Sequence, residues 1–284
     1  QPLAAVQAYD RCLALRPQHA ASWSQRGTAL RDMGRNDEAA DSFERARALG
    51  DDEGLNAYFL AAVRGGTAPA TAPRGYVERL FDDYAPDFDQ HLVDELGYCA
   101  PEQLQRLLVG LGRPTVDSAL DLGCGTGLCG PLLRPYARQL SGVDLSPKML
   151  EQAASLALYD ALETAELCAW LNAHPGAFDL LVAADTLCYF GPLADFAAAA
   201  AAALRPGGWL AFTLETHTEA LDHRLNACGR YSHAPAYPLR VLAGAGFGQL
   251  RSQPVVLRRE RGAPVEGLVV LARRPAAPGY ACAD

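Results

Sequence analysis

The sequence predicts an α/β domain preceded by an all-α helical segment. From residue 118 onwards, short apolar strands alternate with helices, which is the pattern of a parallel sheet covered on both faces. Residues 1 to 50 instead contain an internal repeat with a shift of 34 residues. A stretch rich in proline, glycine and threonine, GGTAPATAPRG, separates the two patterns and is typical of a linker.

The first segment carries one complete helical unit and part of another. The 34-residue shift superimposes Ala5 on Ala39 and Tyr9 on Phe43. The complete unit, HAASWSQRGTALRDMGRNDEAADSFERARALG, places small residues at the helix contacts. It resembles the tetratricopeptide repeat; the alternative is an ordinary helical hairpin. Such arrays need about three repeats to be stable alone, so we expect either a missing N-terminal part or support from the second domain.

The changes in pattern divide the chain into five segments. The boundaries place repeat helices at 1–64, a linker at 65–75, lid and cap helices at 76–117, the α/β domain at 118–275 and a tail at 276–284. We expect two or three helices between residues 76 and 110. The alanine-rich run FAAAAAAALRPGG is interpreted as a helix outside the membrane.

The α/β domain contains seven candidate strands. They are SALDL (118–122), QLSGVD (139–144), TAELC (164–168), FDLLVAAD (178–185), GWLAFTLE (208–215), 251–259 and 266–273. The last two are separated by RGAPVEG, which favours a hairpin turn. We therefore expect the parallel sheet to end in an antiparallel hairpin.

Charge and cysteine usage exclude several classes of protein. The net charge of −8 disfavours a nucleic-acid surface, which needs an excess of lysine and arginine. No apolar run is long enough to cross a membrane, and we find no signal peptide. The eight cysteines form no CxxC pair and no metal-ligand spacing. We expect buried thiols in a reducing, cytoplasmic compartment and no metal site.

The stretch DLGCGTGLCG (121–130) carries the strongest chemical signal. Counted from Gly125 it matches a dinucleotide fingerprint, and counted from Gly123 it is an acid followed by GxGxG. The second register fits better, because the first glycine should closely follow the strand. Asp121 then lies at the carboxyl end of the strand, where ligands of open α/β sheets bind. An acid there suits an ammonium and a nearby sulfonium better than a pyrophosphate.

This pattern resembles the class I S-adenosylmethionine-dependent methyltransferases over about residues 76 to 275. The resemblance implies a Rossmann-like, seven-stranded methyltransferase sheet, with S-adenosylmethionine as cofactor and S-adenosylhomocysteine as product. LRPGGWLAF matches the loop and fifth strand of that superfamily. Three stretches resemble a bacterial group with N-terminal tetratricopeptide repeats: YVERLFDDYAPDFDQHLVDELGY, GRYSHAPAYPLRVLAGAGF and LRRERGAPVEGLVVLARRP.

The resemblance also implies a set of cofactor-binding residues. Four parts of the cofactor have candidates: the amino-acid tail (Asp121, Gly123, Cys124, Gly125, Gly127), the ribose (Asp144, Leu145), the adenine (Glu166, Leu167) and the methyl group (Asp185). The family more often has Asp where this chain has Glu166. Tyr84, Phe88 and His91 lie at helical spacing and form either core or a lid over the methionine end.

Two further groups of residues have competing interpretations. A nucleophile that is protonated at neutral pH needs a general base, and the segment after the fifth strand offers Tyr231 and His233 as the first candidates, beside Glu215, His217 and His223. Arginines around the terminal hairpin, Arg258 among them, are interpreted as protection of an edge strand. A docking site for an acidic partner is the alternative.

Three functional hypotheses remain. The first is an active methyltransferase whose repeat helices recognise a protein or a carrier-bound substrate. The second is a non-catalytic scaffold, and the third is a small-molecule methyltransferase that uses the repeats for assembly. A dehydrogenase is disfavoured because Lys148 is the only lysine, so no Tyr-x-x-x-Lys pair exists. The acceptor atom and the oligomeric state do not follow from the sequence.

Overall fold

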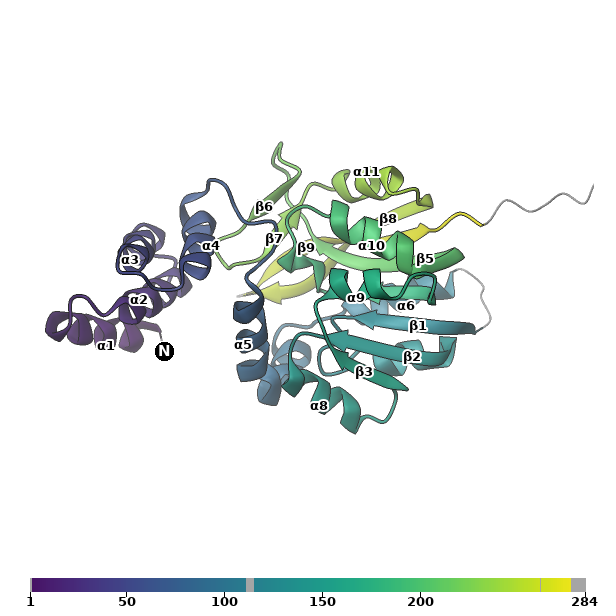
Figure 1. The fold of residues 1–284 in the computed structure, drawn as a ribbon, viewed down its shortest axis with the longest axis horizontal. Helices are drawn as coiled ribbons and strands as arrows, with labels where there is room; N and C mark the ends of the chain where they lie inside the picture. Colours follow the sequence, from purple (N-terminus) through teal and green to yellow (C-terminus); the bar gives the residue numbers. More distant parts are fainter. Residues whose placement is uncertain (1, 111–114, 261, 277–284) are drawn as a thin grey trace, which may run out of the picture. The chain divides into compact units, whose positions relative to one another are not determined.

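The structure, a computed structural model, describes residues 2–110, 115–260 and 262–276. Most of the predicted tail, 276–284, lies outside these residues. The chain forms two compact units (Figure 1). The first, here called the helical unit, comprises the chain up to Tyr76 together with Tyr189–Gly191 and His223–Ser232. The second, the sheet unit, comprises Val77–Cys188, Pro192–Asp222 and the chain from His233.

Four helices build most of the helical unit. They are α1 (Pro2–Leu15), α2 (Ala20–Asp32), α3 (Asn36–Ala48) and α4 (Glu53–Arg64). A Cβ at Gly27 would lie 2.6 Å from the Phe43 ring, so α2 and α3 approach closely only because residue 27 is glycine. The Phe43 and Phe59 rings stack with centroids 5.5 Å apart. The predicted helical hairpin is therefore present, and its identity as a tetratricopeptide repeat stays a prediction.

A seven-stranded sheet with the order β3-β2-β1-β4-β5-β9-β8 forms the second unit. The first five strands are parallel, and β9 pairs antiparallel with β5 and β8. The strands are β1 (Val116–Leu122), β2 (Ala137–Asp144), β3 (Ala161–Thr164), β4 (Phe178–Ala183), β5 (Leu204–Glu215), β8 (Gly248–Glu260) and β9 (Ala263–Arg273). The predicted Rossmann-like α/β class with a terminal antiparallel hairpin is confirmed.

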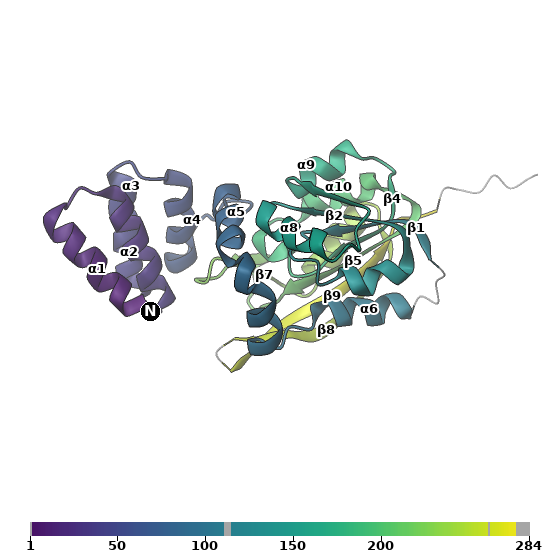
Figure 2. The ribbon, with the colours of Figure 1, turned by 90° about the horizontal axis from the view of Figure 1, so that it is seen from below.

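Helices cover both faces of this sheet (Figures 1 and 2). They are α6 (Ala100–Val109), α7 (Gly130–Leu133), α8 (Pro147–Ser155), α9 (Leu167–Ala173), α10 (Ala194–Ala203) and α11 (Tyr237–Gly244). Helix α5 (Arg74–Tyr84) precedes them in the chain. Short 3-10 turns lie at Ala85–Asp87, Arg134–Tyr136 and Leu187–Tyr189, and a π-helical segment at Gln90–Glu95. Two short strands, β6 (His223–Leu225) and β7 (Tyr231–His233), form a separate small sheet.

An apolar core fixes α6 and α7 on one face of the sheet. Leu104 and Leu108 of α6 and Leu133 of α7 are buried with inward-facing side chains of the central strands, Leu140 and Leu180 among them. Burying each such leucine stabilises the fold by roughly 1.5–3 kcal/mol. The carboxyl ends of β1, β2, β4 and β5 are thereby held at one edge of a rigid sheet.

The third strand and the terminal hairpin differ from their predicted bounds for reasons that the structure shows. The third strand is β3 at 161–164, earlier than the predicted 164–168, because Glu166 caps the N-terminus of α9 and starts a helix at Leu167. The turn between the last two strands is also shorter than the predicted stretch RGAPVEG. β9 already begins at Ala263, and Pro264 is accommodated in it opposite Arg259. Among the described residues, no helix combines the length and apolarity needed to cross a membrane.

Candidate cofactor and acceptor site

Asp121 lies near the carboxyl end of β1 and is 1% exposed. Its Oδ2 accepts a hydrogen bond of 2.7 Å from the Tyr159 hydroxyl. Burial raises the pKa of Asp121 to about 7; the Tyr159 hydrogen bond opposes this shift, and the nearby Asp144 carboxylate adds to it. A buried acid with one neutral partner favours a cationic ligand group, because a cation would compensate its charge.

The loop after Asp121 adopts backbone conformations that glycine accepts readily. Gly123, Gly125 and Gly127 have φ values of 65°, 54° and 92°, whereas Gly130 is not in this left-handed region. A Cβ at Gly123 would lie 2.4 Å from Thr186 Cγ2. The register that starts at Gly123 is therefore the one that shapes the loop, and Gly130 packs against Tyr159 at the start of α7.

Asp144 ends β2 and faces the glycine loop. Its Oδ2 accepts from the Gly125 amide and its Oδ1 from the Ser146 amide, both at 2.9 Å. Burial raises the pKa of Asp144, while these amides and that of Leu145 lower it. Each carboxylate oxygen has a second lone pair, so the group can still accept from two hydroxyls of a ligand. This geometry fits the predicted ribose acid, and Cys124 is buried beside it.

Glu166 makes contacts that the sequence interpretation did not anticipate. Its two oxygens accept from the Cys168 and Ala169 amides at 3.0 and 2.7 Å, so the side chain caps α9. Leu167 is the first residue of that helix and is buried. Their predicted contacts with adenine stay a prediction, and the cap limits how far Glu166 can reach.

The segment that contains Tyr84 packs over the glycine loop. Asp82 accepts from the Ser146 hydroxyl at 2.6 Å, and the Thr126 hydroxyl bonds to Asp89. The nearest atom to the open side of Gly125 is Cε1 of Phe88, 4.0 Å from a Cβ built there. The Tyr84 hydroxyl bonds to His91 within the same segment. Residues 82–91 thus contact the candidate cofactor loop and the start of α8. These contacts favour the interpretation of the segment as a lid over its interpretation as part of the core.

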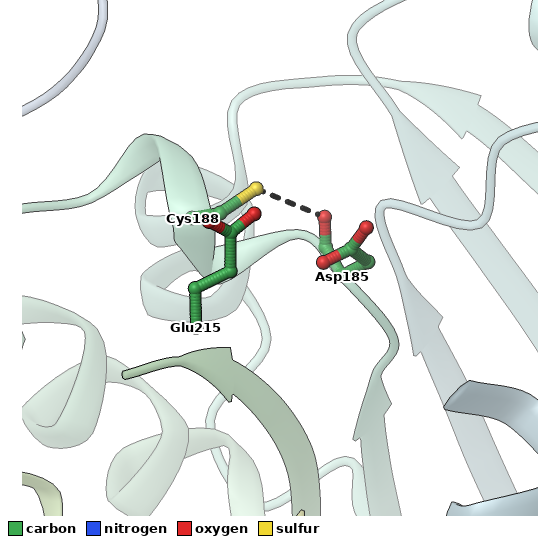
Figure 3. A group of neighbouring side chains, drawn as sticks. All are labelled: Asp185, Cys188 and Glu215. Atoms are coloured by element: carbon green, nitrogen blue, oxygen red, sulfur yellow. Dashed lines mark hydrogen bonds between the residues drawn. The ribbon is translucent and has the colours of Figure 1, made fainter. Parts of the chain in front are cut away.

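Charged side chains gather where β4 and β5 end. Asp185 follows β4 by two residues and has a left-handed φ of 53°. Its amide donates to Thr213 Oγ1 at 2.8 Å, and the Cys188 thiol donates to its carbonyl oxygen at 3.2 Å (Figure 3). Glu215, the last residue of β5, lies beside them and is buried. Thr186 connects this group to the glycine loop, because its hydroxyl donates to the Leu122 carbonyl.

Arg258 joins the two carboxylates. Its side chain is 2% exposed and forms ion pairs with Asp185 at 2.8 Å, with Glu215, and with Glu260 at 2.8 Å. The prediction that Arg258 protects an edge strand is therefore wrong for this residue: β8 is an edge strand, but the Arg258 side chain points into the sheet unit. The alternation of β8 gave no signal for this, because Leu257 and Arg258 are adjacent and both are buried.

Asp185, Cys188 and Glu215 also have the spacing of a metal-ligand set, with their ligand atoms within 4.8 Å of one another (Figure 3). The guanidinium of Arg258 already lies against both carboxylates. A divalent ion would have to share the two acids with a fixed cation a few ångströms away, which is electrostatically unfavourable. The donor set therefore fits an arginine-centred network better than a metal.

The two candidate bases of β7 belong to different units. The Tyr231 side chain is buried, and its hydroxyl donates to the Pro69 carbonyl within the helical unit. His233 belongs to the sheet unit, is buried and stacks on Tyr237 with ring centroids 5.8 Å apart. The backbone carbonyl of His233 accepts from the His217 amide at 3.2 Å, just beyond β5. His233 and His217 therefore adjoin the end of β5, whereas the Tyr231 hydroxyl is directed to the linker.

Comparison with known proteins identifies the family. A model of the methyltransferase domain matches residues 120–210. Human methyltransferase-like protein 27 is 34% identical over 180 residues, which are 59% of this chain and 73% of the relative. The chain belongs to the class I S-adenosylmethionine-dependent methyltransferases. The match begins one residue before Asp121 and ends in β5, so it spans the glycine loop, Asp144 and Asp185.

Two further methyltransferases are similar over part of their length or in fold. Trans-aconitate 2-methyltransferase of Pseudomonas aeruginosa (strain UCBPP-PA14) is 34% identical over 137 residues. The matched part is 47% of this chain and 43% of that relative. The N-methyltransferase NodS from Bradyrhizobium japonicum WM9, solved with S-adenosyl-L-homocysteine, has a TM-score of 0.56 at 19% identity. That structural match covers 70% of this chain and 98% of NodS, and it supports the fold alone.

The residues of this methyltransferase fit S-adenosylmethionine. Glycines let the loop pack closely on Thr186 and Leu156, while the space beside Gly125 stays open as far as Phe88. Asp121 would hold the ammonium of the methionine tail, and Asp144 the ribose hydroxyls. The buried Asp121 carboxylate beside the loop would repel a pyrophosphate, which disfavours a dinucleotide at this position.

Proposed function

We propose that this methyltransferase transfers a methyl group to an amine or hydroxyl nucleophile held at the carboxyl ends of β4 and β5. The observation that carries the proposal is the Asp185–Arg258–Glu215 network beside the glycine loop. With Glu260, three carboxylates surround one guanidinium, so acids outnumber the cation among these four side chains. Such a field attracts a cationic or neutral acceptor and repels an anionic one.

The residues around the network have complementary roles. When bound, S-adenosylmethionine supplies an electrophilic methyl group. Asp185, 19% exposed at its side chain, accepts a hydrogen bond from the acceptor and orients its lone pair. Arg258 holds both carboxylates in place through its ion pairs. His233 or His217, at the end of β5, receives the proton that an amine or hydroxyl loses on methylation.

The names of the relatives point in two directions. An acceptor such as the aconitate in the name of the Pseudomonas relative is anionic, whereas NodS is an N-methyltransferase. The chain spans less than half of the former. The charge of the network favours the second chemistry for this chain.

Incorporation of labelled methyl groups tests this acceptor class. Purified protein is incubated with a lysate and methyl-labelled S-adenosylmethionine, and the products are separated into protein and small-molecule pools. We expect label that survives alkali, because amine and ether products are stable while carboxyl methyl esters release methanol. Label that is lost quantitatively in alkali would overturn the proposal. Asp144→Ala serves as the inactive control, since it removes the ribose acid.

We further propose that helices α1 to α4 are tetratricopeptide-type helices that recognise a protein or a carrier-bound acceptor. The 34-residue period and the close packing of Gly27 on Phe43 support this. Label in the protein pool favours this proposal, and label in the small-molecule pool favours a role of the helices in assembly. A non-catalytic scaffold remains the second candidate. It predicts binding of S-adenosylhomocysteine in calorimetry without transfer into either pool.

A further inference from the structure

Two loops of the methyltransferase region are built into the helical unit. The loop after β4 contributes Tyr189–Gly191, and the loop after β5 contributes His223–Ser232. Both loops start at residues of the acceptor network, at Asp185 and just beyond Glu215. The helical unit therefore contains stretches of the two segments that lead away from the proposed acceptor position.

The loop after β4 is held by main-chain hydrogen bonds to the linker. The Ala72 amide donates to the Tyr189 carbonyl at 2.9 Å, and the Gly191 amide donates to the Ala70 carbonyl at 2.8 Å. Thr71 and Phe190 form an antiparallel bridge between these bonds. The linker at 69–72 is thus paired like a short strand with residues that lie well over 100 positions later in the sequence.

The loop after β5 is held by two tyrosine hydroxyls. Tyr58 of α4 is fully buried and donates to the Gly229 carbonyl at 2.7 Å. Tyr231 is also fully buried and donates to the Pro69 carbonyl. Their rings lie in one aromatic cluster with Phe59 and Tyr76, with centroid separations of 5.0 to 6.3 Å. A buried hydroxyl that already donates to a carbonyl is poorly suited to receive a proton.

The two loops also meet each other. A Cβ at Gly191 would lie 2.9 Å from Cε1 of Tyr231 and 3.0 Å from Cδ2 of His223. Any larger residue at position 191 must displace these rings. Gly191 therefore lets the loops pack against one another inside the helical unit.

We propose that Tyr58, Gly191 and Tyr231 are positioning residues for methyl transfer, which hold the loops after β4 and β5 and so fix the acceptor network at their origins. This inference rests on the proposed function for its catalytic consequence. It assigns Tyr231 a role in positioning in place of the predicted role as a base. The helical unit then contributes to catalysis through its own packing as well as through any partner that it binds.

The experiment compares Tyr58→Phe and Tyr231→Phe with the unaltered chain of residues 1–284. Both changes remove one hydroxyl and keep the ring, so the aromatic cluster remains packed. Tyr9→Phe in α1 is the matched control in the same unit. Hydrogen exchange of 186–191 and 223–232, calorimetry with S-adenosylhomocysteine, and transfer of labelled methyl groups across a pH series are measured for each.

We expect exchange in both loops to rise about three- to tenfold in each variant, which corresponds to the loss of one hydrogen bond. Affinity for S-adenosylhomocysteine should not change, methyl transfer should fall by a similar factor in both variants, and the pH profile should keep its shape. Gly191→Ala should act in the same direction, whereas Gly75→Ala, which has open space around its Cβ, should not.

Three results would overturn the inference. The first is unchanged exchange in both loops, and the second is faster exchange with undiminished transfer. The third is loss of activity in Tyr231→Phe alone together with loss of one limb of the pH profile, which would make Tyr231 the base. If the wild-type chain binds no S-adenosylhomocysteine, the proposed function fails, and the exchange data still decide whether the loops are held as inferred.

Discussion

Asp121 shows how a single buried acid links cofactor binding to stability. Its pKa is raised to about 7 in the folded chain, from an ordinary value of 3.8. Between these values the folded state binds the proton and the unfolded state does not, so stability falls as pH rises from about 4 to about 7. Above pH 7 the folded chain carries a buried charge to which the Tyr159 hydroxyl donates a hydrogen bond, and a bound ammonium would compensate this charge further.

We therefore predict that Asp121→Asn stabilises the ligand-free protein at pH 8, by up to about 4 kcal/mol for a shift of roughly three pKa units. The same change should weaken binding of S-adenosylhomocysteine at least tenfold, because the ammonium loses its counter-ion. Thermal midpoints from pH 5 to 8 and calorimetry check both effects. Asp117→Asn, on the exposed part of the same strand, is the control and should change neither. A lower midpoint for Asp121→Asn at pH 8 would contradict this account.

For a substitution of Arg258 we predict the opposite effect on stability, because the change removes a charge that compensates two buried or half-buried acids. Arg258→Leu removes the guanidinium that both Asp185 and Glu215 contact. Breaking a buried ion pair on one side costs about 3–5 kcal/mol. Chemical denaturation should show a loss of that size, whereas Arg259→Leu, at an exposed neighbouring position, should lie within about 0.5 kcal/mol of wild type. Equal effects of the two variants would show that the network carries no stability.

Asp121 and Arg258 also differ in how far their surroundings can be predicted from the sequence. Asp121 and its glycines lie in one short local motif whose backbone demands are read directly from residue types. Arg258 meets Asp185 and Glu215 across 73 and 43 residues of sequence. Its burial depends on which face of β8 is covered, and arginines in a strand are ordinarily exposed. A local pattern therefore predicts the cofactor loop and misses the network beside it.

At the scale of elements, the segment from α5 to the π-helix behaves as a cover for the cofactor loop. Its anchors are side-chain hydrogen bonds: Asp82 to Ser146, Asp89 to Thr126 and Gln152 to Ala85. The order of strands and helices was predictable from hydrophobic alternation, whereas the start of α9 was not. There the side chain of Glu166 turned an expected strand into a capped helix.

We predict that loosening this cover accelerates cofactor exchange. Asp82→Ala removes the acceptor for both the Ser146 hydroxyl and the Lys148 amide. The loss of about 1 kcal/mol of hydrogen bonding should raise the dissociation rate of S-adenosylhomocysteine about threefold to tenfold. Stopped-flow displacement measures this rate. Asp83→Ala, one residue along and exposed, is the control, and an identical rate for both variants would argue against a cover.

At the scale of the whole molecule, the chain passes repeatedly between its two compact units. The predicted boundary at 65–75 rests on a change in composition, so it divides the chain at a single place in the sequence. The helical unit, however, is completed by Tyr189–Gly191 and His223–Ser232. Neither stretch could be assigned to it from the sequence, because a hydrogen bond from Tyr58 to Gly229 spans 171 residues and leaves no local pattern.

We predict that a fragment of residues 76–284 is less stable than the full chain and less well ordered in these two loops. The cut removes Tyr58, Phe59 and the carbonyl of Pro69, so the Tyr231 hydroxyl loses its acceptor and its ring loses aromatic neighbours. Exposing a ring of this size costs several kcal/mol. Hydrogen exchange should therefore rise to near unprotected rates in 223–232, while β1, β4 and β5 stay protected by their own core. A fragment with full protection in this loop would instead show that the loop orders itself, and that the helices are an independent module attached through a simple linker.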